Sequence, residues 1–191
     1  MANMASVAYA IEGPKETLNK IFQAIVTAIH TDDNRYEEYK ACEYLEIPIE
    51  EGKTRLGGEI SEEPHFDYSQ GHSALRFSAE ERWGLQDFEE LLRQRFPGIK
   101  VYWVVEESGC EVFCTNDREG KYFPDRYWVD TAQDDVYQSE YFRTEEAMYK
   151  WLSKKYGVKN REEVDAFNSG YEDSGTDGEN FIYIHEFEII E

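Results

Sequence analysis

The sequence predicts an α+β fold in which a split βαβ unit is followed by a C-terminal α/β extension. Strand-like and helix-like periodicities alternate twice before residue 106, and helical patterns then precede a final alternating segment. The 191 residues, 40% of them hydrophobic, are enough to bury a sizeable core. We expect residues 1–130 to form the core domain, with an insertion at about 31–54, and residues 131–191 to pack on it as one compact unit.

The most regular stretch covers residues 74–105. Leu75 and Phe77 alternate with polar residues, which predicts a half-buried strand. The next segment predicts a helix, because its apolar residues recur at three- and four-residue steps and share one face. These residues are Leu85, Phe88, Leu91, Leu92 and Phe96. Pro97 ends that helix, and the alternation over 100–105 predicts another strand.

The chain opens on a further strand and helix. Residues 6–11 are apolar and predict a strand, and a broad apolar stripe over 15–29 predicts a helix. In the insertion at 31–54 we expect one short helix followed by an extended segment. A weak strand is expected over 54–61 and a loop over 62–72.

Short turns dominate the segment that follows residue 105. Turns at 106–109 and 116–120 flank a strand around residues 112–113. Residues 121–130 are expected to pair back on that strand, and Pro124 places them at an edge or a bulge.

The last third of the chain predicts helices before a closing strand. Thr144 is a good N-cap for an amphipathic helix over 144–157, and a short helix is expected over 160–167. The composition of 168–180 predicts a loop, and the alternation of 181–190 predicts a strand.

The order of strand, helix, insertion, two strands, helix and strand is that of ferredoxin-like split βαβ sandwiches. The segments VAYAIEGPKETLNKIFQAI, FSAEERWG and LQDFEELLRQRFPGIKVYWVVEESGCEVFC resemble the YubB ferredoxin-like domain family of plasmid- and phage-borne proteins. The resemblance covers residues 6–29 and 55–116, a little under half of the chain. It implies a fold but no functional residue, because the family has no established activity.

Negative charge dominates the composition and is unevenly distributed. The net charge is −21, and residues 31–70 and 131–191 hold most of it, with four basic against twelve acidic and six basic against fifteen acidic side chains. Such a surface either serves solubility, attracts a basic partner or imitates a nucleic-acid backbone. Direct binding to DNA or RNA is disfavoured, because phosphate contacts need a basic face.

Three further features favour a cytoplasmic protein. No apolar run approaches the length of a membrane helix, and the N-terminal residues lack the basic region of a signal peptide. Three cysteines are too few for a disulfide framework, which is typical of a reducing compartment.

The candidates for metal binding are weak. Cys110 and Cys114, with His65 or His72, come nearest to a zinc-ligand set, but no second cysteine pair has suitable spacing. Residues 173–178 resemble the start of a calcium loop, but the glutamate expected at its twelfth position is absent. We therefore expect no metal and no cofactor.

The remaining candidate residues fit surface or core positions better than a catalytic site. Glutamates at 80–81 and 106–107 could lie near one end of a sheet, either for acid–base chemistry or as surface charge. No nucleophile-elbow, Walker or dinucleotide motif accompanies the scattered His30, His65, His72 and His185. Aromatic strand residues are expected to pack under the helices at about 144–167 rather than to stack on RNA bases. These are Tyr102, Trp103, Phe113, Tyr122, Tyr127 and Trp128.

The leading hypothesis is a non-catalytic acidic interaction protein that binds a basic partner or mimics DNA. The alternative is a small-molecule binder or enzyme with a cleft between the sheet and the C-terminal segment. A third possibility is an accessory fold with no partner of its own. The arrangement of the carboxylates in the structure separates these hypotheses, according to whether the carboxylates form a stripe, line a pit or scatter over the surface.

Overall fold

The computed structural model describes residues 3–50, 52–69, 71, 73–172 and 180–190. The chain divides into two compact units, residues 1–117 and residues 118–190. Each unit combines helices with an antiparallel sheet, so the predicted α+β class is confirmed. Among the described helices, none has both the length and the apolar character needed to span a bilayer.

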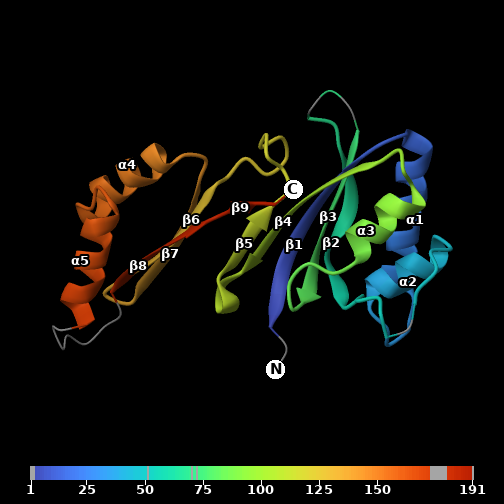
Figure 1. The fold of residues 1–191 in the computed structure, drawn as a ribbon, viewed down its shortest axis with the longest axis horizontal. Coiled ribbons are helices and arrows are strands. Elements are labelled where there is room, and N and C mark those ends of the chain that lie inside the picture. Colours follow the sequence, from blue (N-terminus) through green and yellow to red (C-terminus); the bar gives the residue numbers. More distant parts are fainter. Residues whose placement is uncertain (1–2, 51, 70, 72, 173–179, 191) are drawn as a thin grey trace. The chain divides into compact units, whose positions relative to one another are not determined.

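The first unit is a sheet with three helices. Its strands are β1 (Met4–Glu12), β2 (Gly58–Asp67), β3 (Ala74–Arg82), β4 (Lys100–Glu107) and β5 (Val112–Thr115). Its helices are α1 (Lys15–His30), α2 (Glu37–Tyr44) and α3 (Phe88–Arg95), with a short 3₁₀ helix at Ser108–Cys110. The strand order is β2-β3-β1-β4-β5, and every neighbouring pair in it is antiparallel. Figure 1 shows α1, α2 and α3 on one face of this sheet.

The core of the first unit lies between that face and the helices. Because strand side chains alternate, Val7, Tyr9 and Ile11 of β1 all point to the helices and are buried. The Tyr9 ring stacks on Phe77 at 4.8 Å and meets Phe88 of α3 edge-on at 6.4 Å. Each fully buried apolar side chain of this kind contributes about 1.5–3 kcal/mol of transfer free energy.

The second unit contains a smaller sheet with two helices. Its elements are β6 (Tyr127–Gln133), β7 (Val136–Phe142), α4 (Glu145–Tyr156), α5 (Arg161–Glu172), β8 (Phe181–Glu186) and β9 (Glu188–Ile189). Three of the strands form an antiparallel sheet in the order β7-β6-β8. Thr144 caps α4 as predicted, since its hydroxyl accepts from the Ala147 N–H at 3.2 Å, and Gly157 ends the helix with φ 75°.

Two predictions for the first unit need correction. Residues 62–67 are not a loop but the second half of β2. The sequence hides this strand because Pro64 interrupts it and the pairing register with β3 shifts on both sides of Glu62. The helix predicted from Leu85 begins only at Phe88, because Trp83 and Gly84 take positive φ angles in the preceding turn.

The second unit also differs from the predictions. Residues 127–133 do not pair back on β5; they form β6, which pairs with β7 and β8. The strand β7 was not predicted, because most of it is exposed and it shows no apolar alternation. Helix α5 runs to Glu172, beyond the expected end near residue 167. The boundary between units falls at Asp117, whereas a boundary near residue 130 was expected.

The aromatic side chains expected under the C-terminal helices are divided between several places. Tyr127 joins the core of the second unit, which contains Met148 of α4 and Val164 of α5. Trp103 lies instead in the core of the first unit. Trp128 is on the other face of the second sheet, where it stacks on His185 at 5.0 Å.

Candidate functional site

The sheet of the first unit brings three glutamates into one row on the face opposite α1–α3, which we call the outer face. Alternation along β3 points Glu80 to the outer face and Glu81 to the helices. In the strand registers, Glu80 pairs with Glu59 of β2 and with Ser6 of β1, and Ser6 pairs on its other side with Glu106 of β4. Glu59, Glu80 and Glu106 form what we call the acidic row.

The geometry of the row places like charges close together. Neighbouring strands lie about 4.8 Å apart, so the row spans about 14 Å from β2 to β4. The Cβ atoms of the directly opposed Glu59 and Glu80 are then about 5 Å apart, where two unit charges in water repel by about 0.8 kcal/mol.

The part of the row around Glu59 and Ser6 is exposed to solvent. Glu59 is exposed, and Ser6 beside Glu80 is small and exposed. Glu62 extends the negative charge into the next row, where it accepts a hydrogen bond from the Ser78 hydroxyl at 3.0 Å. Small and acidic side chains therefore form a shallow negative surface.

Both arginines of β3 have partners away from the acidic row. Arg76 lies 3.4 Å from the Asp67 carboxylate, toward the opposite end of the strand. The Arg82 guanidinium lies over the ring of Tyr36, 4.8 Å from its centroid.

A second carboxyl pair lies buried on the helix side of the same strand. Glu81 accepts hydrogen bonds from the Tyr9 hydroxyl and from the backbone N–H of Gln86. Glu38 of α2 lies against Glu81 and accepts from the backbone N–H of Gly58 at 3.0 Å. Neither glutamate is exposed to solvent.

The pKa shifts of the buried pair indicate which of the two carboxyls holds a proton. Burial, and then the charge of Glu81, raises the pKa of Glu38 well above its usual value. Burial also raises the pKa of Glu81, while hydrogen bonds from Glu38 and Tyr9 lower it. As a carboxylate, Glu38 would leave its Oε1 without a donor, whereas a protonated Glu38 can donate to Glu81. The two shifts together favour the proton on Glu38 rather than on Glu81.

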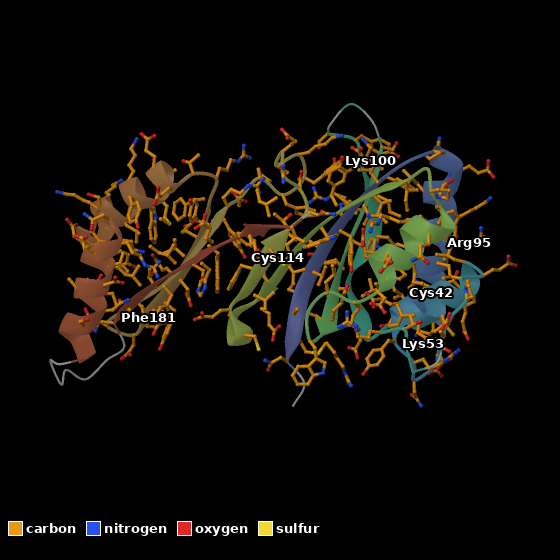
Figure 2. The ribbon with its side chains drawn as sticks, viewed as in Figure 1. Cys42, Lys53, Arg95, Lys100, Cys114 and Phe181 are labelled. Carbon is orange, nitrogen blue, oxygen red and sulfur yellow. The ribbon has the colours of Figure 1, made fainter. Side chains whose placement is uncertain are left out.

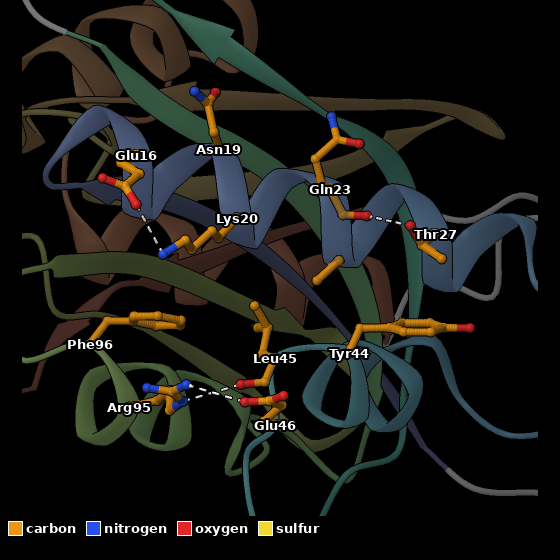
Figure 3. Close-up of a pocket in the computed structure, with 11 residues that line it drawn as sticks. Glu16, Asn19, Lys20, Gln23, Thr27, Tyr44, Leu45, Glu46, Arg95 and Phe96 are labelled. Carbon is orange, nitrogen blue, oxygen red and sulfur yellow. Dashed lines mark hydrogen bonds and ion pairs between the residues drawn. The ribbon is translucent and has the colours of Figure 1, made fainter.

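A groove of about 660 Å³ lies on the helical side of the first unit (Figure 3). Lys20 of α1 pairs with Glu16 at 3.1 Å, and Arg95 of α3 lies 3.9 Å from Glu46. The Arg95 Nε also donates to the Leu45 carbonyl at 3.1 Å. The carboxyls with a raised pKa are not among the lining residues, so the groove offers charge-paired groups and an apolar floor rather than an acid–base pair.

The metal candidates are not brought together. Figure 2 shows Cys114 on β5, where it is buried, whereas Cys110 is exposed in the 3₁₀ helix and accepts from the Asn3 side chain at 2.7 Å. Within the described residues, no group of three His, Cys, Asp or Glu side chains is placed to hold a metal ion. His72 and the calcium-like segment 173–178 lie outside the described residues.

Three of the four glutamates singled out in the sequence enter these two groups, whereas Glu107 is buried at the end of β4. Glu80 and Glu106 lie two strands apart in one row, and Glu81 enters the buried pair. Sequence reasoning did not assign Glu59 or Glu38, because strand register and long-range packing bring them there. Their one local signal is the high density of acidic residues in 31–70.

Comparisons with known proteins identify no relative. No family model matches the chain, and neither a curated protein nor a solved structure matches it.

Proposed function

We propose that the protein is a non-catalytic interaction protein whose acidic row binds lysine or arginine side chains of a basic partner. The observation that carries this proposal is the register that aligns Glu59, Glu80 and Glu106 on the outer face. The net charge of −21 speeds the encounter with a cationic partner and orients it. Cations from the partner relieve the repulsion between the glutamates, so binding and local stabilisation occur together.

Spacing favours a compact cationic site on the partner over a long DNA-like interface. The three carboxylates of the row are separated by about 5 Å and about 10 Å, a mean of about 7 Å, whereas duplex DNA carries one charge per about 1.7 Å of axis. Mimicry of DNA is the narrower version of the proposal, and it needs acidic surface beyond this row.

The first unit is, in our proposal, a ferredoxin-like sandwich, related to the YubB domains that its sequence resembles. The order β4-β1-β3-β2 with antiparallel neighbours, and helices following β1 and β3, support this assignment. The fold provides an open sheet face, and the chemistry of the site depends on the glutamates placed there.

Capture from a cell lysate at two salt concentrations tests the proposed function. The wild-type chain is compared with Glu59→Gln/Glu80→Gln/Glu106→Gln and with Glu145→Gln/Glu146→Gln/Glu162→Gln, which removes the same charge from exposed helix positions of the second unit. We expect basic proteins to be retained at ~0.1 M salt and released at ~1 M, where screening is nearly complete at contact distance. The row variant should lose them and the helix variant should keep them; equal loss from both, or retention at high salt, would contradict the proposal.

A second candidate function is small-molecule binding in the groove of Figure 3. Its volume of about 660 Å³ falls within the usual range of ligand pockets. A screen of metabolites by melting temperature tests it. If small-molecule binding is the function, at least one metabolite should raise the melting temperature of the wild-type chain but not that of Arg95→Ala.

A further inference from the structure

The strand β7 is an exposed edge of the second sheet. It lies at the end of the order β7-β6-β8 and pairs with β6 over its whole length without a register shift. Every side chain from Val136 to Tyr141 is exposed. An edge of this kind is a template for pairing with another strand.

The hydrogen bonds of β8 show which backbone groups of β7 face outward. Asn168 of α5 binds both the N–H and the C=O of Ile182, at 2.9 and 3.0 Å, so these groups point away from β6. Thr131 of β6, the register partner of Ile182, therefore directs its own N–H and C=O toward Gln138 of β7. By alternation, the outward N–H and C=O groups of β7 are those of residues 137, 139 and 141.

Two other edges carry protection that the described residues do not show on β7. On β8, Asn168 occupies the outward backbone groups of Ile182 as a neighbouring strand would. On β2, Pro64 and two register shifts interrupt the edge. The sequence of β7, VYQSEYF, contains no proline or lysine, and its pairing is regular.

We propose that β7 pairs antiparallel with β7 of a second copy of this chain, centred on Ser139. In this register Ser139 faces the partner's Ser139, and Tyr137 faces the partner's Tyr141. These are the residues with outward N–H and C=O groups, so each facing pair forms two backbone hydrogen bonds. The two small sheets join into one, with their helices on the same side.

The side chains of β7 are compatible with this register and disfavour one centred on Glu140. Gln138 faces the partner's Glu140, so no two carboxylates are opposed and the amide can donate to the acid. Opposed tyrosines are a favourable cross-strand pair. If the partner strand shifts by one residue, the outward backbone groups of one copy lie opposite inward groups of the other and cannot bond. If the pairing is centred on Glu140, the two Glu140 side chains lie opposite each other and repel.

Disulfide trapping tests the register in the full-length chain. In a Cys110→Ser background, which removes the exposed thiol, we compare Ser139→Cys with Gln138→Cys. Facing residues at position 139 have Cα atoms about 5.5 Å apart, within disulfide range, whereas the two residues 138 lie roughly 8 Å apart. We expect the first variant to form a covalent dimer under mild oxidation and the second to remain uncrosslinked. Equal crosslinking of both would overturn the proposal.

Sedimentation of Ser139→Pro and Ser139→Ala supplies the independent test. Proline removes an outward N–H but no bond to β6, so the fold should be retained while the dimer dissociation constant rises about tenfold or more. Both variants lose the Ser139 hydroxyl bond to Asp130, so alanine is the matched control and should dimerise.

Dimerisation should also strengthen with salt, because both copies are acidic, which distinguishes it from binding to a basic partner. A wild-type chain that stays monomeric, or a dimer indifferent to Ser139→Pro, would refute the proposal.

Discussion

At the scale of single residues, Glu80 and Glu81 show how alternation gives adjacent identical side chains different chemistry. Glu80 points to the outer face and contributes its charge to the acidic row. Glu81 points to the helices and accepts bonds from Tyr9 and Gln86 in a site without solvent. In our proposal the surface charge serves association, whereas the buried carboxyl is tolerated because several donors satisfy it.

The buried proton on Glu38 makes stability depend on pH. The raised pKa means that the folded chain holds this proton after the unfolded chain has lost it, so stability falls as pH rises above about 4.3 until the folded pKa is passed. Glu38→Gln keeps the shape and the donor to Glu81 and removes the titration. We expect urea unfolding to show that this variant gains stability relative to wild type from about pH 5 to about pH 8.

Glu81→Gln is the matched control, because it neutralises the other member of the pair. Its amide would face the donors of Tyr9 and Gln86, so we expect a loss of about 1–3 kcal/mol. If Glu38→Gln were less stable than Glu81→Gln at about pH 8, the assignment of the proton to Glu38 would be wrong.

Gly58 has to be glycine because of close approach. A Cβ at this position would overlap the carboxyl of Glu38, whereas a Cβ at Gly57 would make ordinary contacts with Arg82, at 3.6 Å or more. We expect Gly58→Ala to lower the free energy of unfolding by about 1–3 kcal/mol and Gly57→Ala to change it much less. Thermal unfolding of both checks this; in a Glu38→Ala background most of the Gly58→Ala effect should disappear.

At the scale of elements, α3 supports the first sheet through a narrow contact. Phe88 and Leu92 are fully buried, and Leu85, Leu91 and Phe96 pack at the edge of the core. Glu89 does not belong to the apolar set of this helix, yet only 7% of it is exposed. Burial raises the pKa of Glu89, and Arg93 pairs with it at 2.7 Å.

Removing the Phe88 ring should damage folding. Phe88→Ala removes a buried ring that contacts Tyr9 and Phe77, and we expect a loss of about 3–5 kcal/mol. Phe88→Asp should abolish the cooperative transition, because it also buries a charge. Calorimetry measures both; an unchanged melting temperature for Phe88→Asp would refute the assignment of this helix face.

The elements that sequence predicted well have local signals. The apolar stripe of α1, the alternation of β4 and the Thr144 cap of α4 can be read within a few residues. Those that it missed depend on distant partners. The second half of β2 is recognisable only from its pairing with β3, and β7 only from its pairing with β6.

The candidate site was predictable in part for the same reason. Neighbouring glutamates at 80–81 and 106–107 mark strand ends, but their alignment through Ser6 requires the order of β3, β1 and β4. Glu59 joins the row only because β2 pairs with β3 despite its irregular register.

At the scale of the whole molecule, the net charge of −21 opposes self-association and favours cationic partners. The two proposed surfaces respond to salt in opposite directions. Binding to the acidic row should weaken with ionic strength, and pairing through β7 should strengthen. One salt titration followed by sedimentation and by capture therefore separates them.

The most direct measurement is an NMR titration of the chain with a short arginine- and lysine-rich peptide at low salt. We expect amide shifts to concentrate on Ser6, Glu59, Glu80 and Glu106, and Glu59→Gln/Glu80→Gln to remove them. Shifts spread evenly over the acidic surface, or centred on exposed acids of α4 and α5, would contradict the claim that this row is the binding site.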